Sequence, residues 1–506
     1  MPALRVTIAN EEPVRRGTYV LYWMIAARRT ANSFALDHAI ARAQQLGRPL
    51  VVLEPLRAGY RWASDRLHAF VLDGMADNAR AFAAAGITYL PYVEPEPGHG
   101  KGLLAALARR ACLIVTDEQP GFFLPKMVSA AAAGLGVRVE LVDGNGVLPL
   151  RAMEREYPSA VTWRRQFQKI AYPHLLERPA RAPLEDVPRS LAGGEIAGTI
   201  VRRWAGASAL LADRRALAQL PIDHGVPPVA LHGGAQAGDA AVTRFLEHRL
   251  GGYADGRNHP DADTSSGLSP YLHFGHVAAH DVVERVWRSA GWDPSRIAGA
   301  KATASKAGWW GLPAPAEAFL DELITWRELG YGFCFHRADF DRWSSLPAWS
   351  RATLTAHATD PRPHRYARTE LEAARTHDDI WNAAQRQLVG EGRIHNYLRM
   401  LWGKKILEWS ATPRAALATL IELNNKYAID GRDPNSYSGI CWTLGRFDRP
   451  WGPERPIFGT VRYMSSDMTR KKLDLDGYLR RWAGAAAPVT PLRPDRGAPA
   501  AGRPAP

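Results

Sequence analysis

The sequence predicts an N-terminal α/β domain with a doubly wound parallel sheet, followed by a larger all-α domain. In residues 1–145, short apolar runs alternate with amphipathic helical stretches, which is typical of βαβ units. From about residue 206 the apolar residues recur at helical spacing, and no convincing strand appears before about residue 455. A chain of 506 residues also exceeds one ordinary hydrophobic core, so two or more domains are expected.

The strands of the first domain are expected where apolar runs are short and bounded by helical patterns. These runs are 18–24, 49–56, 87–94, 112–118 and 137–144. The amphipathic stretches 64–85 and 103–110 are expected to form two of the connecting helices. No GxGxxG motif follows the first run, so the sequence does not support a dinucleotide bound in the Rossmann manner.

Composition divides the chain into four parts. We expect residues 1–150 to form the α/β domain and residues 151–205 to form a proline-containing linker over the surface. Residues 206–483 are expected to form the helical domain. The tail 484–506 is mostly Pro, Ala, Gly and Arg, which favours disorder because it cannot build a core.

Four segments of the helical domain carry more specific predictions. The run 263–287 combines a polar turn with a helix that begins near Ser269. Residues 319–336 have the strongest helical period, whereas the glycine- and lysine-containing segment 288–314 is expected to be a mobile loop. Alternation in 455–465 predicts a small β-hairpin.

The charge of the chain indicates the class of partner. A formal net charge of +13 and an isoelectric point of about 9.7 favour nucleic acid or an anionic membrane surface; the alternative is a coding bias toward Arg and Ala. Cys112, Cys334 and Cys441 lack metal-ligand spacing, so we expect no disulfide scaffold, no zinc site and a reducing cytoplasm. We find no secretory signal and no apolar run of about 18 residues, so we expect no membrane span.

Tryptophans gather near the C-terminal end, interleaved with Arg, Lys, Asn and Asp, at Trp381, Trp402, Trp409, Trp442 and Trp451. Trp402 and Trp409 are two helical turns apart, so their rings are expected on one face about 10 Å apart, with Trp381 from the preceding helix beside them. Such a ladder of indoles can relay single electrons between a buried redox group and solvent. The alternative is an aromatic stripe of an ordinary helical core.

Polar residues beside these tryptophans favour a planar redox ligand. Arg399 and Asp430, with Asn424 nearby, are a plausible way to hold an isoalloxazine ring, although the same residues would also form an ordinary buried ion pair. A second polar group consists of hydroxyl residues before and at a helix start: Thr264, Ser265, Ser266 and Ser269. It would seat a pyrophosphate, or simply cap the helix.

Two further patterns point to recognition of bases and phosphates. Glu322 and Trp326 share a helical face, with Arg327 beside them, and could recognise a base; alone, such a pair is more often the edge of a core. Cations near the C-terminal end alternate with aromatic residues, which suits phosphate neutralisation and base stacking. These cations are Lys404, Lys405, Arg446, Arg449, Arg455, Arg462, Arg470, Lys471 and Lys472.

Several long motifs occur together in the order of one known family. They are YVLYWMIAARRTANSFAL, SSGLSPYLHFGH, DELITWRELGYGF, EGRIHNYLRMLWGKKILEW and NNKYAIDGRDPNSYSGICWTLGRFDRPWGPERPIFGTVRYMS. Over roughly residues 15–483 the chain thereby resembles the class II cyclobutane pyrimidine dimer photolyases, of the photolyase/cryptochrome family. Ser436 stands where many relatives have Gly, and 288–314 matches nothing in the family pattern.

The resemblance implies FAD bound in the helical domain. The residues that would hold its phosphates and ribityl chain are Tyr253, Thr264, Ser265, Ser266, Leu268 and Ser269. Asn424 would face flavin N5, Arg399 with Asp430 would flank the ring, and the pocket would be completed by Arg432, Asp433 and Asn435. Trp402, Trp381 and Trp409 would relay electrons to the flavin, in that order outward.

The resemblance also implies the substrate and the reaction. Glu322 would hydrogen-bond a flipped-out dimer, and Trp326, Met400 and Trp442 would pack against its bases. The DNA would further contact Arg327, Arg446, Arg449 and Arg462. The expected activity is that of a lyase repairing ultraviolet-damaged DNA, double- or single-stranded, by electron transfer from excited reduced FAD.

Several accompanying expectations remain open at the level of sequence. The first domain could bind an antenna chromophore of the deazaflavin type. A cytoplasmic, nucleoid-associated monomer is expected. The alternatives are a cryptochrome-like blue-light receptor, repair of the (6-4) photoproduct, and a DNA-binding protein without enzymatic activity. An intact set of Glu322, Trp326, Met400 and Trp442 argues against the receptor, because a receptor need not keep a lesion pocket.

Overall fold

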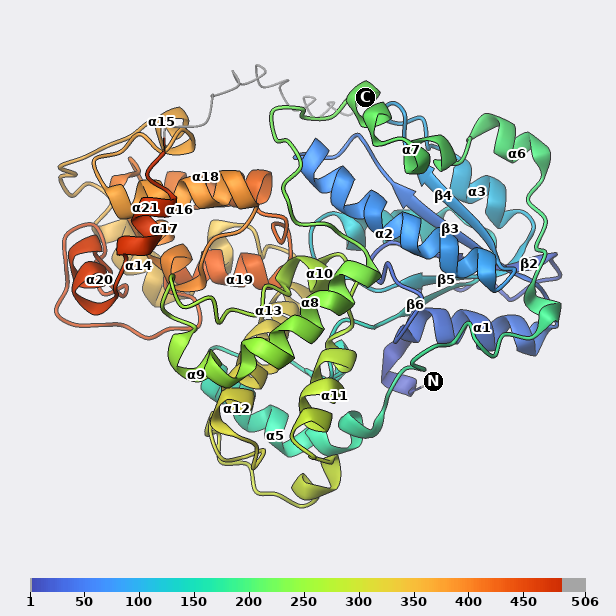
Figure 1. The fold of residues 1–506 in the computed structure, drawn as a ribbon, viewed down its shortest axis with the longest axis horizontal. Coiled ribbons are helices and arrows are strands. Elements are labelled where there is room, and N and C mark those ends of the chain that lie inside the picture. The colour runs from blue at the N-terminus through green and yellow to red at the C-terminus, as the bar shows by residue number, and fades with distance from the viewer. Residues whose placement is uncertain (1, 485–506) are drawn as a thin grey trace, which may run out of the picture.

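The computed structural model describes residues 2–484, and a six-stranded sheet dominates its N-terminal part (Figure 1). The strand order is β1-β6-β5-β2-β3-β4. The bounds are β1 Val6–Ile8, β2 Tyr19–Trp23, β3 Leu50–Leu56, β4 Thr88–Val93, β5 Ala111–Asp117 and β6 Val139–Val142. Strands β2 to β6 are parallel, which confirms the predicted sheet. Strand β1 pairs antiparallel with β6 at the edge of the sheet. It was not predicted, because three residues are too few to reveal a strand-like alternation of apolar and polar side chains.

Helices cover both faces of the sheet because its strands bury side chains on both sides. Leu21 of β2 joins a core with α3 and α4, whereas the neighbouring Val20 joins a core with α1 and α2 on the other face. The four helices are α1 Phe34–Leu46, α2 Asp65–Ala84, α3 Leu103–Ala108 and α4 Leu124–Ala133. Two covered faces explain why the predicted strands read as continuous apolar runs.

The helical part surrounds a second, larger core. Its helices are α5 Ala160–Leu176, α8 Ala235–His248, α9 Tyr253–Gly256, α10 Ser269–His273, α11 Ala279–Ser289, α12 Ala314–Leu320, α13 Arg327–His336, α14 Ala348–Ala356, α15 Arg368–Glu372, α16 Asp379–Glu391, α17 Asn396–Trp409, α18 Pro413–Tyr427, α19 Pro434–Thr443, α20 Ser466–Lys472 and α21 Asp476–Arg481. Helices α6 Gly198–Arg203 and α7 Ser208–Ala212 pack instead against the sheet domain. Helices α14 to α21 lie at the end of the molecule opposite the sheet (Figure 1). None of the described helices is long and apolar enough to cross a membrane.

The segment 151–205 is more ordered than the linker that the sequence suggested. It contains the 17-residue helix α5, whose Trp163 and Phe167 are 0% and 2% exposed in the helical core. Pro173 lies inside this helix and, with the other prolines nearby, weakened the helical pattern in the sequence. Residues 198–203 and 208–212 form two further short helices, α6 and α7.

The segment 288–314 is irregular, as predicted, but its tryptophans anchor it, so the expectation of a mobile loop is corrected. Trp309 and Trp310 lie 6.0 and 5.9 Å from the ring of Phe167 in α5. Trp292 packs on Trp287 of α11 and donates from Nε1 to the carbonyl of Trp310 at 2.6 Å. Burial of three indoles fixes the segment against two helices.

The predicted hairpin around Gly459 is reduced to one antiparallel bridge between Arg455 and Gly459. Trp451 also donates its backbone N–H to the carbonyl of Thr460. The left-handed residues Ile457 and Gly459 turn the chain too tightly for a longer ladder. The disorder predicted for the tail 484–506 concerns residues that, apart from Gly484, lie outside the described part of the chain.

Candidate functional site

A cavity of about 400 Å³ lies within the helical part, between the serine-rich turn, the helix α12–α13, and helices α17 to α19. It brings together most of the residues that the sequence singled out: Tyr253, Ser266, Leu268, Ser269, Glu322, Trp326, Arg327, Arg399, Met400, Trp402, Asn424, Asp430, Asp433, Asn435 and Trp442. Its volume is within the range of small-molecule and cofactor sites, about 300 to 1,000 Å³. We call it the main cavity.

Glu322 and Trp326 reach the main cavity from a π-helical turn, Asp321–Trp326, between α12 and α13. The sequence predicted one regular helix over 319–336, because the apolar period survives a single widened turn. Such turns are rare in helices and often occur at functional sites.

Arg257 pairs with Glu322 through its Nη1 atom. Burial raises the pKa of Glu322, while the Arg257 charge opposes this shift. The two side chains remain 29% exposed each, toward the cavity. No sequence pattern indicated Arg257, which stands alone in the glycine-containing run GYADGRN.

An ion pair and an amide line the main cavity between α17 and the turn before α19. Arg399 Nη2 lies 3.1 Å from Asp430 Oδ1. Asn424 is buried near the end of α18 and donates from Nδ2 to Ser436 Oγ at 2.8 Å and to Asn425 Oδ1 at 3.1 Å. These bonds use both amide protons and hold the side chain in one orientation. Ser436, noted in the sequence only as a departure, thus positions Asn424.

The serine-rich turn contributes unevenly. Ser266, Leu268 and Ser269 line the main cavity, whereas Thr264 and Ser265 lie outside its lining. Thr264 Oγ1 is nonetheless buried without a hydrogen-bond partner among the described residues. A Cβ atom at Gly256 would lie 2.7 Å from it, so this glycine is required for the close approach.

Two apolar side chains, Met400 and Trp442, line both the main cavity and a neighbouring groove. Beneath the Trp442 ring, 5.1 Å from its centroid, lies Lys404 Nζ. Lys404 is fully buried and donates to the carbonyl of Thr443 at 2.7 Å. Burial lowers the pKa of Lys404 to about 7. The sequence interpretation of Lys404 as a DNA-facing cation is therefore wrong, because its ammonium group lies inside the protein.

Three tryptophans form a continuous chain of ring contacts, here called the tryptophan chain. Trp402 lines the main cavity, and its ring is parallel to that of Trp381 with centroids 6.4 Å apart. Trp409 follows, 5.4 Å from Trp381 and nearly perpendicular to it. All three are at most 2% exposed. The geometric order 402, 381, 409 outward from the cavity matches the order expected from the sequence.

Hydrogen bonds fix the inner two indoles. Trp381 Nε1 donates to the carbonyl of Trp402 at 3.0 Å, and Trp402 Nε1 donates to Gln385 Oε1 at 2.9 Å. Buried indoles usually have such partners. The rings are therefore held in contact by α16 and α17 rather than merely packed.

Three predicted site residues point elsewhere. Arg432 is buried, donates to the carbonyl oxygens of Gly431 and Ile429, and lines the cavity of the first domain instead. Arg446 is 4% exposed and pairs with Glu156, so it is not available to DNA. The Arg327 side chain borders the main cavity, but its Nη1 donates to the carbonyl of Asn145 in the first domain at 2.7 Å, which corrects its expected role as a DNA contact.

The groove beside the main cavity is basic and aromatic. Arg462 lies 4.0 Å above the Trp451 ring and is held by Asp448 at 2.7 Å. Arg449 is exposed and lies 4.6 Å from the same ring. Lys472 lies 4.9 Å above Tyr397 on the groove wall. The combination of cations and rings suits an anionic ligand with flat groups.

A second cavity, of about 520 Å³, lies at the carboxyl ends of the parallel strands of the sheet. Its lining is largely apolar and includes Trp23, Tyr60, Phe122 and Phe123. Arg432 lines this second cavity, whereas Asp430 and Asp433 of the same turn line the main cavity. Family resemblance suggested a second ligand in this domain, but the sequence pattern identified none of these lining residues.

Known proteins resemble this chain over most of its length. A deoxyribodipyrimidine photo-lyase of Methanothermobacter thermautotrophicus is 33% identical over 476 residues, covering 94% of this chain and 97% of that protein. One of Oryza sativa is 33% identical over 500 residues, covering 95% and 91%. No protein-family model matches the chain.

Solved structures share the fold at low sequence identity. A class III photolyase from Agrobacterium tumefaciens covers 92% of this chain and 87% of its own, with a TM-score of 0.64 and 16% identity. A cryptochrome from Synechocystis covers 92% and 89%, with a TM-score of 0.65 and 16% identity. These two likenesses show the α/β and helical fold alone.

Proposed function

The chain belongs to the deoxyribodipyrimidine photo-lyase family, and on that premise we propose that it is a class II enzyme that splits cyclobutane pyrimidine dimers in DNA under light. The observation that carries this proposal is the junction of the main cavity with the basic groove at Met400 and Trp442. A cofactor site that opens onto a phosphate-binding surface, with a carboxylate and apolar rings at the junction, suits a flipped-out lesion.

The main cavity fits FAD by its chemistry. The hydroxyls of Ser266 and Ser269 line the cavity and suit the diphosphate, and Thr264, whose buried Oγ1 has no partner among the described residues, belongs to the same turn just outside the lining. Arg399 and Asp430 would flank the ring, and Asn424, held by Ser436, would face it. When bound and fully reduced, FAD would supply on excitation the electron that opens the cyclobutane ring, and would recover it afterwards.

The residues of the chain would bind and orient the lesion. A dimer stacks poorly in the duplex, so its extrusion costs less than that of normal bases. Trp326, Met400 and Trp442 would cover its apolar faces and exclude water. Glu322 would accept hydrogen bonds from its N–H edges as a carboxylate, which Arg257 stabilises, while the groove cations Arg449 and Arg462 would neutralise neighbouring phosphates.

The cavity of the first domain would hold the antenna chromophore in this proposal. Its aromatic lining suits a planar, conjugated ligand of the deazaflavin type, and Arg28 and Arg432 suit an anionic one. Residues 1–150 would then act as the antenna domain and residues 206–483 as the catalytic domain.

The test uses purified protein and irradiated DNA that carries both major photoproducts. We expect flavin absorbance in the protein as isolated, and loss of cyclobutane dimers in blue light but not in darkness. Loss of (6-4) photoproducts instead of cyclobutane dimers would show that the (6-4) photoproduct is the substrate. Bound flavin with light-induced absorbance changes but no repair would favour a cryptochrome-like receptor. Absence of flavin after reconstitution would contradict the proposal altogether.

A further inference from the structure

The tryptophan chain ends on a ring that solvent barely reaches. Trp409 is 2% exposed, so a reductant in solution has little access to it. Two aromatic side chains lie against it: Tyr366, with ring centroids 5.2 Å apart, and His377, at 5.5 Å. Tyr366 is half-buried and His377 is exposed, so the ring contacts continue from Trp409 to the surface.

The phenol of Tyr366 has a base beside it. Its Oη donates to His377 Nδ1 at 2.5 Å, and the backbone N–H of His377 donates back to Oη at 3.0 Å. The His377 ring also stacks on exposed His364 at 3.8 Å. A phenol loses an electron far more readily when its proton can leave at the same time, and a neutral imidazole in a short hydrogen bond accepts that proton.

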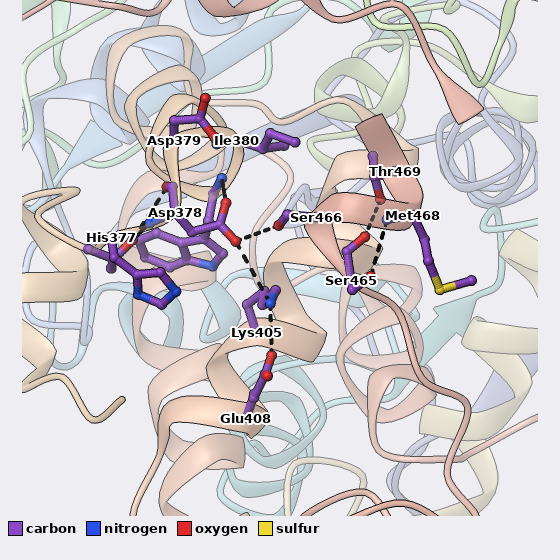
Figure 2. A network of polar contacts seen from close by, with 12 residues as sticks. His377, Asp378, Asp379, Ile380, Lys405, Glu408, Ser465, Ser466, Met468 and Thr469 are labelled. Carbon is purple, nitrogen blue, oxygen red and sulfur yellow. Dashed lines mark hydrogen bonds and ion pairs between the residues drawn. The ribbon is translucent and has the colours of Figure 1, made fainter. Parts of the chain in front are cut away.

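An ammonium group and two carboxylates lie beside Trp409. Lys405 Nζ lies 5.6 Å from the Trp409 ring and is held by Glu408 at 2.9 Å. Figure 2 shows Lys405 between Glu408 and Asp378, with Ser466 bound to the same Asp378 oxygen. Because two carboxylates compensate the Lys405 charge, this cluster does not itself drive a cation off Trp409. A cation on the buried Trp409 ring is nevertheless poorly solvated, whereas oxidised Tyr366 is neutral once its proton has left. The geometry therefore suits a last electron donor beyond Trp409.

We propose that Tyr366, with His377 as its proton acceptor, is the surface end of the tryptophan chain. This inference rests on the proposed function, because it needs a flavin that withdraws electrons through Trp402. One electron passes from Tyr366 to oxidised Trp409, and the phenolic proton passes to His377 Nδ1. A thiol in solution then returns a hydrogen atom to the Tyr366 oxygen, His377 releases its proton to solvent, and two thiols end as one disulfide.

A merely structural role for the pair would have no redox signature. The same hydrogen bond could anchor the loop before α15, and its loss would then affect stability alone. The test must therefore detect a tyrosine radical and its dependence on the proton acceptor.

The experiment uses the flavin-loaded, oxidised protein, labelled with ring-deuterated tyrosine, in the presence of dithiothreitol. After a light flash, we expect an electron paramagnetic resonance signal of a neutral tyrosyl radical, narrowed by the deuterium. Tyr366→Phe should abolish this signal and slow the steady photoreduction of the flavin severalfold. His377→Gln keeps Tyr366 but removes its proton acceptor. This variant should therefore show a weaker tyrosyl signal and slower photoreduction of the flavin. Tyr172→Phe, a half-buried tyrosine of α5 remote from the tryptophan chain, is the matched control and should change neither readout.

The dependence on pH supplies an independent readout. Burial and the neighbouring His364 lower the pKa of His377, while the carboxylates of Asp378 and Glu408 raise it and Lys405 lowers it. Protonation of His377 removes the acceptor, so the tyrosyl yield in the unsubstituted protein should fall as the medium becomes more acidic than that pKa. His377→Gln should abolish this dependence.

The outcomes separate this inference from the proposed function. Photoreduction at the same rate in Tyr366→Phe, with no tyrosyl signal in the parent protein, would overturn the inference and leave repair untouched. Absence of bound flavin would overturn the proposed function as well, whereas absence of photoreduction in a flavin-loaded parent protein that still repairs DNA would overturn the inference alone. Melting temperatures of the variants check that a slower reaction does not reflect unfolding.

Discussion

At the scale of single residues, Lys404 carries the least expected charge near the site. Its ammonium group is fully buried below Trp442, and its pKa is lowered from 10.5 to about 7 by burial. In the unfolded chain the group keeps its ordinary pKa, so between these two values the unfolded state binds the extra proton. The free energy of unfolding should therefore rise with pH over this window.

Replacing Lys404 by Met tests this effect. The stability of the unsubstituted protein minus that of Lys404→Met should increase from pH 7 to about pH 9, by at most about 1.4 kcal/mol per pH unit. Chemical denaturation at several pH values measures it. Exposed Lys471→Met is the control and should give a flat difference. A flat difference for Lys404→Met as well would show that its ammonium group is not perturbed.

Glu322 is the residue on which lesion recognition depends most directly. Glu322→Gln keeps the size of the side chain but removes the charge and leaves Arg257 without its partner. A hydrogen bond to a charged group contributes about 1.5 to 3 kcal/mol, so light-driven repair by prereduced protein should fall roughly tenfold or more.

The neighbouring carboxylate provides the comparison. Asp321 occupies the same π-helical turn but pairs with Arg164 at 2.7 Å, outside the main cavity. Asp321→Asn should lower stability with little loss of repair per folded molecule. Equal loss of repair in both variants would contradict the role assigned to Glu322.

At the scale of elements, helices α16 and α17 hold the tryptophan chain. Trp402→Phe interrupts it at the cavity, and should abolish photoreduction of oxidised flavin while leaving repair by prereduced protein largely intact. Flavin bleaching and dimer loss under light measure the two activities separately. Trp163→Phe, equally buried in α5, controls for general destabilisation. Parallel loss of both activities in Trp402→Phe would argue against a relay.

The same elements show what the sequence could and could not reveal. The seven-residue spacing predicted that Trp402 and Trp409 share one helical face. The contacts of Trp381 with both rings were expected because its helix, α16, directly precedes α17. Arg446 and Arg449, by contrast, look alike in sequence. Arg446 is buried because Glu156, 290 residues away along the chain, pairs with it, and no local pattern encodes such a partner.

Irregular segments were the least predictable for the same reason. Arg257 comes from a turn, and Trp309 and Trp310 come from a segment without period, yet all three are positioned by distant helices. The parallel strands and the main cavity residues on helices were predictable because periodicity and burial act within one element.

At the scale of the whole molecule, the net charge of +13 suits a polyanionic partner, and the proposed function assigns DNA to the groove next to the main cavity. The groove next to the main cavity is lined by exposed Arg455 and Lys472 among aromatic rings, and exposed Arg449 lies at its edge against the Trp451 ring. Helix α3, with exposed Arg109 just after it, lies at the opposite end of the molecule from α20 (Figure 1). Removal of a cation beside the groove should therefore weaken DNA binding, whereas removal of Arg109 should not.

Salt dependence measures how many phosphates the groove neutralises. Each contact contributes about −0.9 to the slope of log K against log salt concentration, so Arg449→Ala and Arg455→Ala should each reduce the slope by about that amount. The loss of affinity should be the same for damaged and undamaged duplexes, because phosphate contacts carry no lesion information. Arg109→Ala should leave the slope unchanged, since Arg109 follows α3, which lies at the other end of the molecule from α20 beside the groove. An unchanged slope in both groove variants would mean that DNA binds elsewhere. This result would contradict the proposal that DNA in the groove presents its lesion to the main cavity.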